Sequence, residues 1–294
     1  MKAIKLASIF AVSAVAAAVS TTTIAAEPVF SGTAGVSFTS GASKDDVSGT
    51  DDAEIEIAID TGVVYMEVEF SVTDTETVTT GLEKAYVTQG AVQFGRFDGT
   101  LADAGFLGIA ENSAIDLVSN SDTDDTGIRY SISDELTVSI EATQANGVAD
   151  ASSEVGMALS YVADMGPGTF GISGGSVGES NAVNAGYSMD LGGATVAVAY
   201  AVGEQVDTDS SSTTYQQVLD KTSAALSVEM TPSDATTLNI EYTSNTSETI
   251  ANVETDKDGF YVYGDYTAGD LTYYVKYYSK DFGDTTEIGV NASF

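Results

Sequence analysis

The sequence predicts an all-β chain that folds as a transmembrane antiparallel β-barrel of sixteen strands. Three observations predict this fold. Apolar and polar residues alternate with a period of two over many short segments. Tight turns and longer polar connections join these segments in alternation, which is typical of a membrane barrel. After residue 26, no segment contains 18 consecutive apolar residues, so a membrane helix is not expected.

The alternation is clearest in 64–72. Its even-numbered positions are apolar, whereas Tyr65, Glu67 and Glu69 lie on the other face. Two of the expected segments, 169–175 and 182–189, are rich in Gly, Ser and Ala, and the strand count falls to fourteen if they form a loop. The sixteen strands are expected near 29–38, 53–61, 63–72, 82–89, 91–97, 126–132, 136–143, 155–163, 169–175, 182–189, 194–202, 221–230, 236–244, 257–266, 270–280 and 285–294.

Short and longer connections alternate along the chain. Those after even-numbered strands are short and contain Gly, Asp or Pro, which are turn residues. Those after odd-numbered strands are mostly longer and polar or acidic, and an even strand count places both termini on the same side of the membrane. The longer connections are expected at 39–52, 73–81, 98–125, 144–154, 176–181, 203–220, 245–256 and 281–284.

The N-terminal segment has the features of a secretory signal peptide. Lys2 and Lys5 precede an apolar run, and small residues then lead to Ala26. We therefore expect a signal peptide at 1–26 and one barrel domain at 27–294.

The last ten residues also alternate, and the chain stops on Phe294. A final strand of this kind suits a barrel, because pairing it with the strand near 29–38 leaves no free edge in the membrane.

Charge and composition exclude several classes of function. Without the signal peptide, eight basic residues stand against 44 acidic ones, a net charge of −36, so nucleic acid is an unfavourable partner and cations are favourable ones. Cys and His are absent, which excludes disulfides, a Ser-His-Asp triad, a Cys nucleophile and the usual zinc ligands. Carboxylate-only chemistry such as glycoside hydrolysis remains compatible with the composition, but 44 acids supply a carboxylate pair by chance. We expect no enzyme activity and no cofactor.

The segments 82–96 (LEKAYVTQGAVQFGR) and 126–130 (TGIRY) are motif-like. They resemble the hairpin before the third loop and the strand after it in the Gram-negative general porin family. The chain departs from the family in lacking the P-E-F-G-G-type segment of loop 3 and in being shorter than many members. The resemblance implies that 98–125 is a long loop 3 folded into the lumen. It also implies a homotrimer in the outer membrane of a Gram-negative bacterium, and a sorting signal at Phe294 read by the barrel-assembly machinery.

The resemblance also implies a pore constriction, in which carboxylates of loop 3 face basic residues on the barrel wall. A transverse field between the two groups would select solutes by charge and polarity. The alternative is that the basic residues are scattered on the surface. The constriction residues implied here are Arg96, Arg129 and Lys84 on the wall and Asp103, Glu111 and Asp116 on the loop.

The alternation of apolar and polar residues does not predict the direction of all three wall residues equally clearly. Arg129 alternates with apolar neighbours and should face the lumen. Arg96 shares the face of Phe94, which would place it toward lipid at a cost of roughly 2–4 kcal/mol, so we expect a bulge or strand end at Gly95 that turns it inward. Lys84 shares its face with Tyr86, which leaves its direction open.

Acidic residues opposite the apolar faces should line the lumen and give the pore a preference for cations. In a soluble sandwich, the same pattern would be a solvated face. The expected lumen residues are Glu54, Glu56, Glu67, Glu69 and Glu287.

Acidic clusters also lie in the connections, at 45–46, 51–52 and 122–125. They could bind Ca²⁺ or Mg²⁺ and bridge to lipopolysaccharide, but no EF-hand spacing is present, so no metal site is assigned and a solvated acidic loop is the alternative. Because Trp is absent, an aromatic girdle must use Tyr and Phe. Candidates for it, a few of which could point inward, are Tyr65, Tyr86, Tyr161, Tyr187, Tyr200, Tyr263, Tyr277 and Tyr278.

The sequence therefore predicts a water-filled outer-membrane channel for passive diffusion of small hydrophilic solutes and ions. A substrate-specific channel, for example for oligosaccharides, is an alternative that requires an aromatic track, of which only Tyr65 is a hint. A secreted acidic β-rich adhesin or surface protein is an alternative of another class.

Overall fold

The computed structural model describes residues 29–41, 48–73, 77–97, 99–102, 126–142, 155–207, 213–215, 217–249 and 253–293. For residues 30, 41, 48–54, 72, 73, 77 and 280 the description covers the backbone alone.

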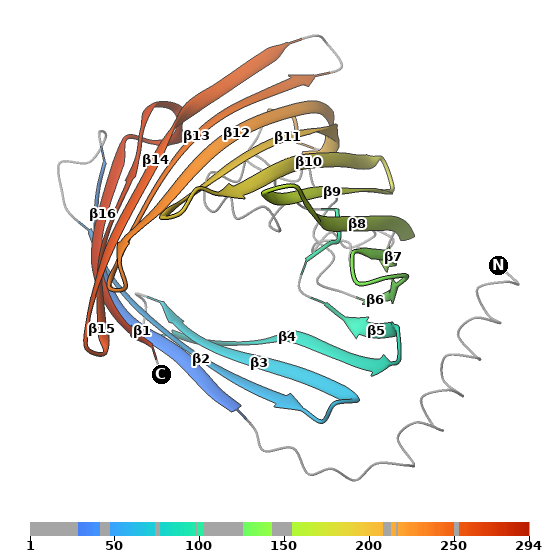
Figure 1. The fold of residues 1–294 in the computed structure, drawn as a ribbon, viewed down its shortest axis with the longest axis horizontal. Coiled ribbons are helices and arrows are strands. Elements are labelled where there is room, and N and C mark those ends of the chain that lie inside the picture. Colours follow the sequence, from blue (N-terminus) through green and yellow to red (C-terminus); the bar gives the residue numbers. More distant parts are fainter. Residues whose placement is uncertain are drawn as a thin grey trace, which may run out of the picture.

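Sixteen antiparallel strands form one closed barrel, in which each strand pairs with its neighbours in sequence and β1 pairs with β16 (Figure 1). This confirms the count of sixteen, and the two weak segments are β9 and β10. The strands are β1 (Val29–Gly41), β2 (Ser48–Asp60), β3 (Val64–Thr73), β4 (Thr77–Gln89), β5 (Val92–Arg96), β6 (Thr126–Ser131), β7 (Leu136–Ala142), β8 (Val155–Met165), β9 (Gly168–Val177), β10 (Ser180–Asp190), β11 (Ala194–Val206), β12 (Val218–Ser233), β13 (Thr236–Thr249), β14 (Glu254–Ala268), β15 (Leu271–Tyr278) and β16 (Thr285–Ser293), with a short 3-10 helix, η3 (Lys280–Phe282), between the last two.

The seam between β1 and β16 closes the barrel. Nine residue pairs join the two strands, from Thr33 opposite Ser293 to Gly41 opposite Thr285. Because every strand has two neighbours, no strand of the barrel is an edge.

Tight turns gather at one end of the barrel, called here the turn end, and the other connections at the loop end. At two turns the local chemistry is the same. The carboxylates of Asp60 and Asp190 each accept a hydrogen bond of 2.7 Å from the N–H two residues on, at Gly62 and Gly192. Both glycines have positive φ, which a residue with a Cβ rarely adopts.

Several connections at the loop end are shorter than the sequence indicates. β4 begins at Thr77, β12 begins at Val218 and β13 continues to Thr249, while β9 and β10 are joined by Gly178 and Glu179 alone. β1 also ends at Gly41 and β2 begins at Ser48. The expected loops at 39–52, 73–81, 176–181, 203–220 and 245–256 are therefore wrong in length. Polar residues in the sequence indicate where a strand leaves the lipid. The strands are longer than the sequence indicates because the backbone hydrogen bonds between them continue beyond that point.

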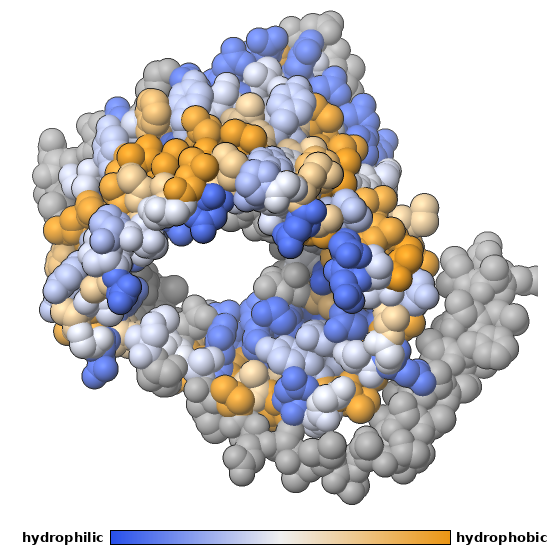
Figure 2. Space-filling model, in the orientation of Figure 1, coloured by the Kyte–Doolittle hydropathy of each residue, from blue (hydrophilic) through white to orange (hydrophobic). Residues whose placement is uncertain are grey.

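The two faces of the wall have opposite chemistry. In β7, Ile140 is 51% exposed on the outer face, whereas Ser139 and Glu141 are 5% and 3% exposed on the inner face. Figure 2 shows apolar residues around the outside of the barrel and polar ones around an open passage through it. This arrangement is the one that lipid outside and water inside require. Among the described residues, no helix is long and apolar enough to cross a membrane.

Candidate functional site

A β-bulge in β4 settles the direction of Lys84. Glu67 of β3 lies opposite Lys84, but Val68 lies opposite Leu82, so Glu83 is the extra residue. Because of this shift, Leu82 is 43% exposed on the outer face, while Lys84 reaches the inner face beside Glu67.

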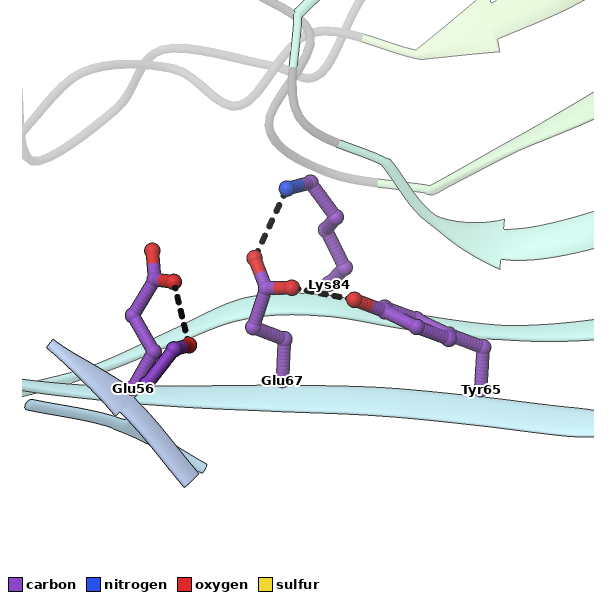
Figure 3. Close-up of polar contacts among 5 residues, drawn as sticks. Glu56, Tyr65, Glu67 and Lys84 are labelled. Carbon is purple, nitrogen blue, oxygen red and sulfur yellow. Dashed lines mark hydrogen bonds and ion pairs between the residues drawn. The ribbon is translucent and has the colours of Figure 1, made fainter. Parts of the chain in front are cut away.

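Glu67 is the centre of a polar cluster on the inner wall (Figure 3). Lys84 donates to it through an Nζ–Oε1 contact of 2.7 Å, and the Tyr65 hydroxyl donates to its other oxygen. Glu67 is only 7% exposed, and the ammonium group and the hydroxyl offset the cost of burying its charge. Glu56 points from β2 toward the same region and accepts a hydrogen bond of 3.3 Å from Ser31.

The other expected lumen carboxylates lie on the same face. Glu69 lies directly opposite Glu56, so two like charges meet across β2 and β3. Glu54 follows Glu56 by two positions and has the same register face, although its side chain is not described. Glu287 of β16 lies opposite Lys276, with an Nζ–Oε1 distance of 3.8 Å.

Arg129 lies on the inner face, as its alternation with Ile128 and Tyr130 predicts. Its guanidinium carbon lies 4.2 Å from the ring centre of Phe97, and its Nη2 donates a hydrogen bond of 2.8 Å to the carbonyl of Gly99. The Phe97 ring stacks on Tyr86 at 5.3 Å, and Tyr86 stacks on Tyr65 at 5.1 Å. A row of three rings therefore ends on the guanidinium group.

Arg96 is the last residue of β5 and follows a glycine with unusual geometry. Gly95 has a φ of 145°, and a Cβ there would collide with the Ala85 carbonyl and the Tyr86 backbone. β5 continues through Gly95 and pairs in register up to Arg96, so the strand is not interrupted at Gly95, and the inward direction expected for Arg96 stays a prediction.

The start of the 98–125 connection lies against the inner wall. The Thr100 hydroxyl and the Leu101 N–H donate to the Glu141 carboxylate at 2.5 and 3.0 Å. Asn184 of β10 donates a hydrogen bond of 2.8 Å to the Ala102 carbonyl, and Ala102 is fully buried. Glu141 and Asn184 are on inner faces, so residues 99–102 run inside the barrel, from β5 toward β10.

Sequence reasoning missed both of these anchor residues. Glu141 was detectable, since it alternates with Ile140 on a strand whose outer face is apolar. Asn184 lies in a segment of small residues with little pattern, and gave no such signal. The loop carboxylates Asp103, Glu111 and Asp116, and the terminal Phe294, lie outside the described residues.

A second feature that the sequence did not reveal is a group of four tyrosines on the inner face of β14 and β15, called here the tyrosine wall. It consists of Tyr261, Tyr263, Tyr274 and Tyr278. Tyr263 and Tyr278, and likewise Tyr65 and Tyr86, were girdle candidates in the sequence, but these four side chains line the inside of the barrel. Tyr200 faces outward and is 55% exposed.

Charges of both signs occur on the inner wall, so the local balance differs from the total charge of the chain. Near the loop end, Lys221 donates a hydrogen bond of 2.7 Å to Gln205, and Lys257 lies opposite Asn245 on the inner face. Within the described ranges, no group of three acidic side chains is placed to hold a metal ion. Clusters 45–46 and 122–125 lie outside those ranges.

No protein-family model and no curated protein sequence matches the chain. Its structure is similar to OmpF of Salmonella typhi in complex with daunomycin, with a TM-score of 0.72 and 12% identity over 92% of this chain and 98% of that one. It is also similar to a loop-deletion mutant of OmpT, an outer membrane protein of Vibrio cholerae (TM-score 0.65, 16% identity, 92% and 100% covered). A third similar structure is a triple mutant of the Rhodopseudomonas blastica porin (TM-score 0.59, 12% identity, 91% and 100% covered). At these identities the likeness shows the fold alone, and this chain has the closed-barrel fold of these porins.

Proposed function

We propose that the chain forms a water-filled channel for passive diffusion of small hydrophilic solutes and ions across the outer membrane. One observation carries this proposal: a closed barrel with an apolar outer wall and a polar inner wall encloses an open passage (Figure 2). No covalent step is required, since flux follows the solute gradient. Purified protein added to a planar lipid bilayer should produce stepwise increases in conductance, and a folded barrel that produces none would refute the proposal.

We infer that the channel prefers cations. Glu56 and Glu69 face each other without a base opposite either in the β2–β3 register, and the full chain carries a net charge of −34. The bases on the inner wall reduce this preference, but the whole chain has only 10 bases against 44 acids. A salt gradient across the bilayer should give a reversal potential of cationic sign, and an anionic sign would contradict the inference.

We further infer a constriction where the 98–125 connection meets the wall. Lys84 is paired with Glu67 at 2.7 Å, and Arg129 lies where the connection begins, with its Nη2 donating to the Gly99 carbonyl, so both bases contribute to the local field. The proposed partners across the passage are Asp103, Glu111 and Asp116, and Arg96 at the end of β5 is proposed as a further base of the constriction. Replacing Arg129 with glutamine removes one positive charge beside this connection and should therefore shift the reversal potential toward cations.

The location, the oligomeric state and the partners of the channel are also proposals. The apolar outer faces support an outer-membrane location and packing into a homotrimer, and the similar OmpT of Vibrio cholerae has a trimer form. Lipopolysaccharide with bound Ca²⁺ or Mg²⁺, and assembly machinery that reads Phe294, are the further partners proposed.

A secreted acidic adhesin remains the alternative of a different class. It predicts a soluble protein, whereas the barrel predicts extraction by detergent and a mobility on an unheated SDS gel that shifts after boiling. A soluble protein without this shift would favour the adhesin.

A further inference from the structure

The tyrosine wall deepens the proposed function and rests on it. We propose that this wall is a binding subsite for linear oligosaccharides that pass through the channel. The argument uses its ring geometry, the polar groups at its rim and its position beside the open passage.

The four rings lie close together, and in two of their three contacts the ring planes are nearly parallel. Tyr261 and Tyr263 have ring centres 6.4 Å apart and planes inclined by 12°, and Tyr263 and Tyr274 have centres 6.5 Å apart and planes inclined by 29°. Tyr261 is only 4% exposed, and its ring centre lies 5.1 Å from that of Tyr278. Tyr263 and Tyr274 are half-buried, so parts of both rings remain open to the lumen.

A glycine on the next strand lets one of these rings lie close to the wall. A Cβ at Gly289 of β16 would collide with the phenol end of Tyr274, whose Oη would lie 2.5 Å away. The ring therefore covers the backbone of β16 instead of projecting across the passage. A ring held in this way is a platform on which a flat ligand can stack.

Acidic and basic side chains line the rim of the platform. Asp265 accepts a hydrogen bond of 2.9 Å from the Tyr263 hydroxyl, and Glu287 accepts one of 2.9 Å from Tyr274. Lys276 lies 3.8 Å from Glu287. On β13, opposite Tyr263, Asn239 is 3% exposed and its Oδ1 has no hydrogen-bond partner within the described part of the chain.

This combination fits a sugar better than an organic cation. A pyranose ring has an apolar face of C–H bonds, which packs on aromatic rings, and an equatorial rim of hydroxyls, which need donors and acceptors together. An organic cation would have to share the Tyr274 ring with the Lys276 ammonium group, which lies 5.4 Å from the ring centre, and the two positive charges would repel each other. A neutral sugar meets no such repulsion.

The subsite lies where a passing solute would meet it. The inner faces of β14 and β15 border the open passage, which lies toward the side of the barrel formed by β1 and β14–β16 (Figures 1 and 2). Tyr263 and Tyr274 are a few residues from the turn between β14 and β15, so a solute would contact them near the turn end.

The test is blockage of ion current by glucose oligomers of increasing length in planar bilayers. For the wild-type channel we expect a saturable block that strengthens with oligomer length. In the Tyr263→Leu/Tyr274→Leu double variant, the half-saturating concentration should rise by about tenfold, equivalent to ~1.4 kcal/mol. The Tyr263→Phe/Tyr274→Phe variant should keep most of the block if ring stacking carries the binding.

Two further variants distinguish the loss of sugar binding from general damage to the channel. Tyr273→Leu is the matched control, since Tyr273 is on the same strand but is 49% exposed on the outer face, and its block should equal that of the wild type. Gly289→Ala should displace the Tyr274 ring and weaken the block while the ring is still present.

The outcomes distinguish this proposal from the channel itself. Normal conductance with only size-dependent, non-saturable exclusion, equal to that of a neutral polymer of the same size, would overturn the subsite and leave the channel intact. Block by a quaternary ammonium ion but not by sugars would overturn the assignment to sugars. Absence of any conductance would instead refute the proposed function.

Discussion

Glu141 is the strongest described anchor of the 98–125 connection, so its replacement by alanine should release that connection. The carboxylate accepts hydrogen bonds from the Thr100 hydroxyl at 2.5 Å, the Leu101 N–H at 3.0 Å and the Ser139 hydroxyl at 2.7 Å. Two of these three bonds hold the connection to the wall. Both are made to a charged group that is only 3% exposed, which places them among the stronger hydrogen bonds in proteins.

The size of the effect follows from these two bonds. A hydrogen bond to a charged group contributes about 1.5–3 kcal/mol net, so Glu141→Ala should weaken local anchoring by about 3–6 kcal/mol. The equilibrium between anchored and released states should then shift by roughly 10²- to 10⁴-fold. The bonds from Arg129 to Gly99 and from Asn184 to Ala102 remain, both at 2.8 Å.

Single-channel recording is the suitable assay, because a released segment inside the passage would change the current on the timescale of its motion. We expect greater open-channel noise and closure at a lower voltage for Glu141→Ala, with an intermediate result for Glu141→Gln. Ser139→Ala is the matched control, since it removes a partner of Glu141 that does not belong to the connection. Recordings of a correctly folded Glu141→Ala protein that match the wild type would refute the reasoning.

Three further predictions concern charge, backbone and assembly. Glu67→Gln removes the carboxylate that compensates Lys84 and should shift the reversal potential toward anions, by more than Glu69→Gln, which frees no base; equal shifts would contradict the pairing. Gly95→Ala should destabilise the barrel by about 1–3 kcal/mol because of its φ of 145° and the collision with Ala85, measured as a lower unfolding temperature on SDS gels, whereas an unchanged temperature would show that β5 adapts. Deletion of Phe294 should reduce the amount of assembled barrel far more than the conductance of each channel, and normal assembly without it would exclude a sorting role.

The strand count and the direction of most side chains could be predicted because they follow from a simple alternation. A wall between lipid and water imposes a period of two on every strand. Arg129 lies between the apolar Ile128 and Tyr130, so this period predicts its inward direction. The same rule could not place Lys84. The bulge at Glu83 inserts one residue, and nothing in the local composition indicates where such an insertion occurs.

The tyrosine wall escaped prediction for a different reason. Tyrosine is suited both to the membrane interface and to a polar lumen, so its identity does not determine its face. β15 carries tyrosines on both faces, with Tyr273 and Tyr277 outward and Tyr274 inward. The anchoring of 99–102 was also beyond the sequence, because hydrogen bonds between Thr100 and Glu141, or Ala102 and Asn184, depend on barrel closure.

The seam between β1 and β16 has a consequence for the order of assembly. It joins Thr33 to Ser293, 260 positions apart, so the entropy of closing the largest loop in the chain must be overcome before this pairing contributes any stability. Until it forms, β1 and β16 are both edge strands with unpaired backbone groups that can pair with another chain. Substitutions that weaken either strand should therefore slow barrel formation and favour aggregation, even where the finished channel conducts normally.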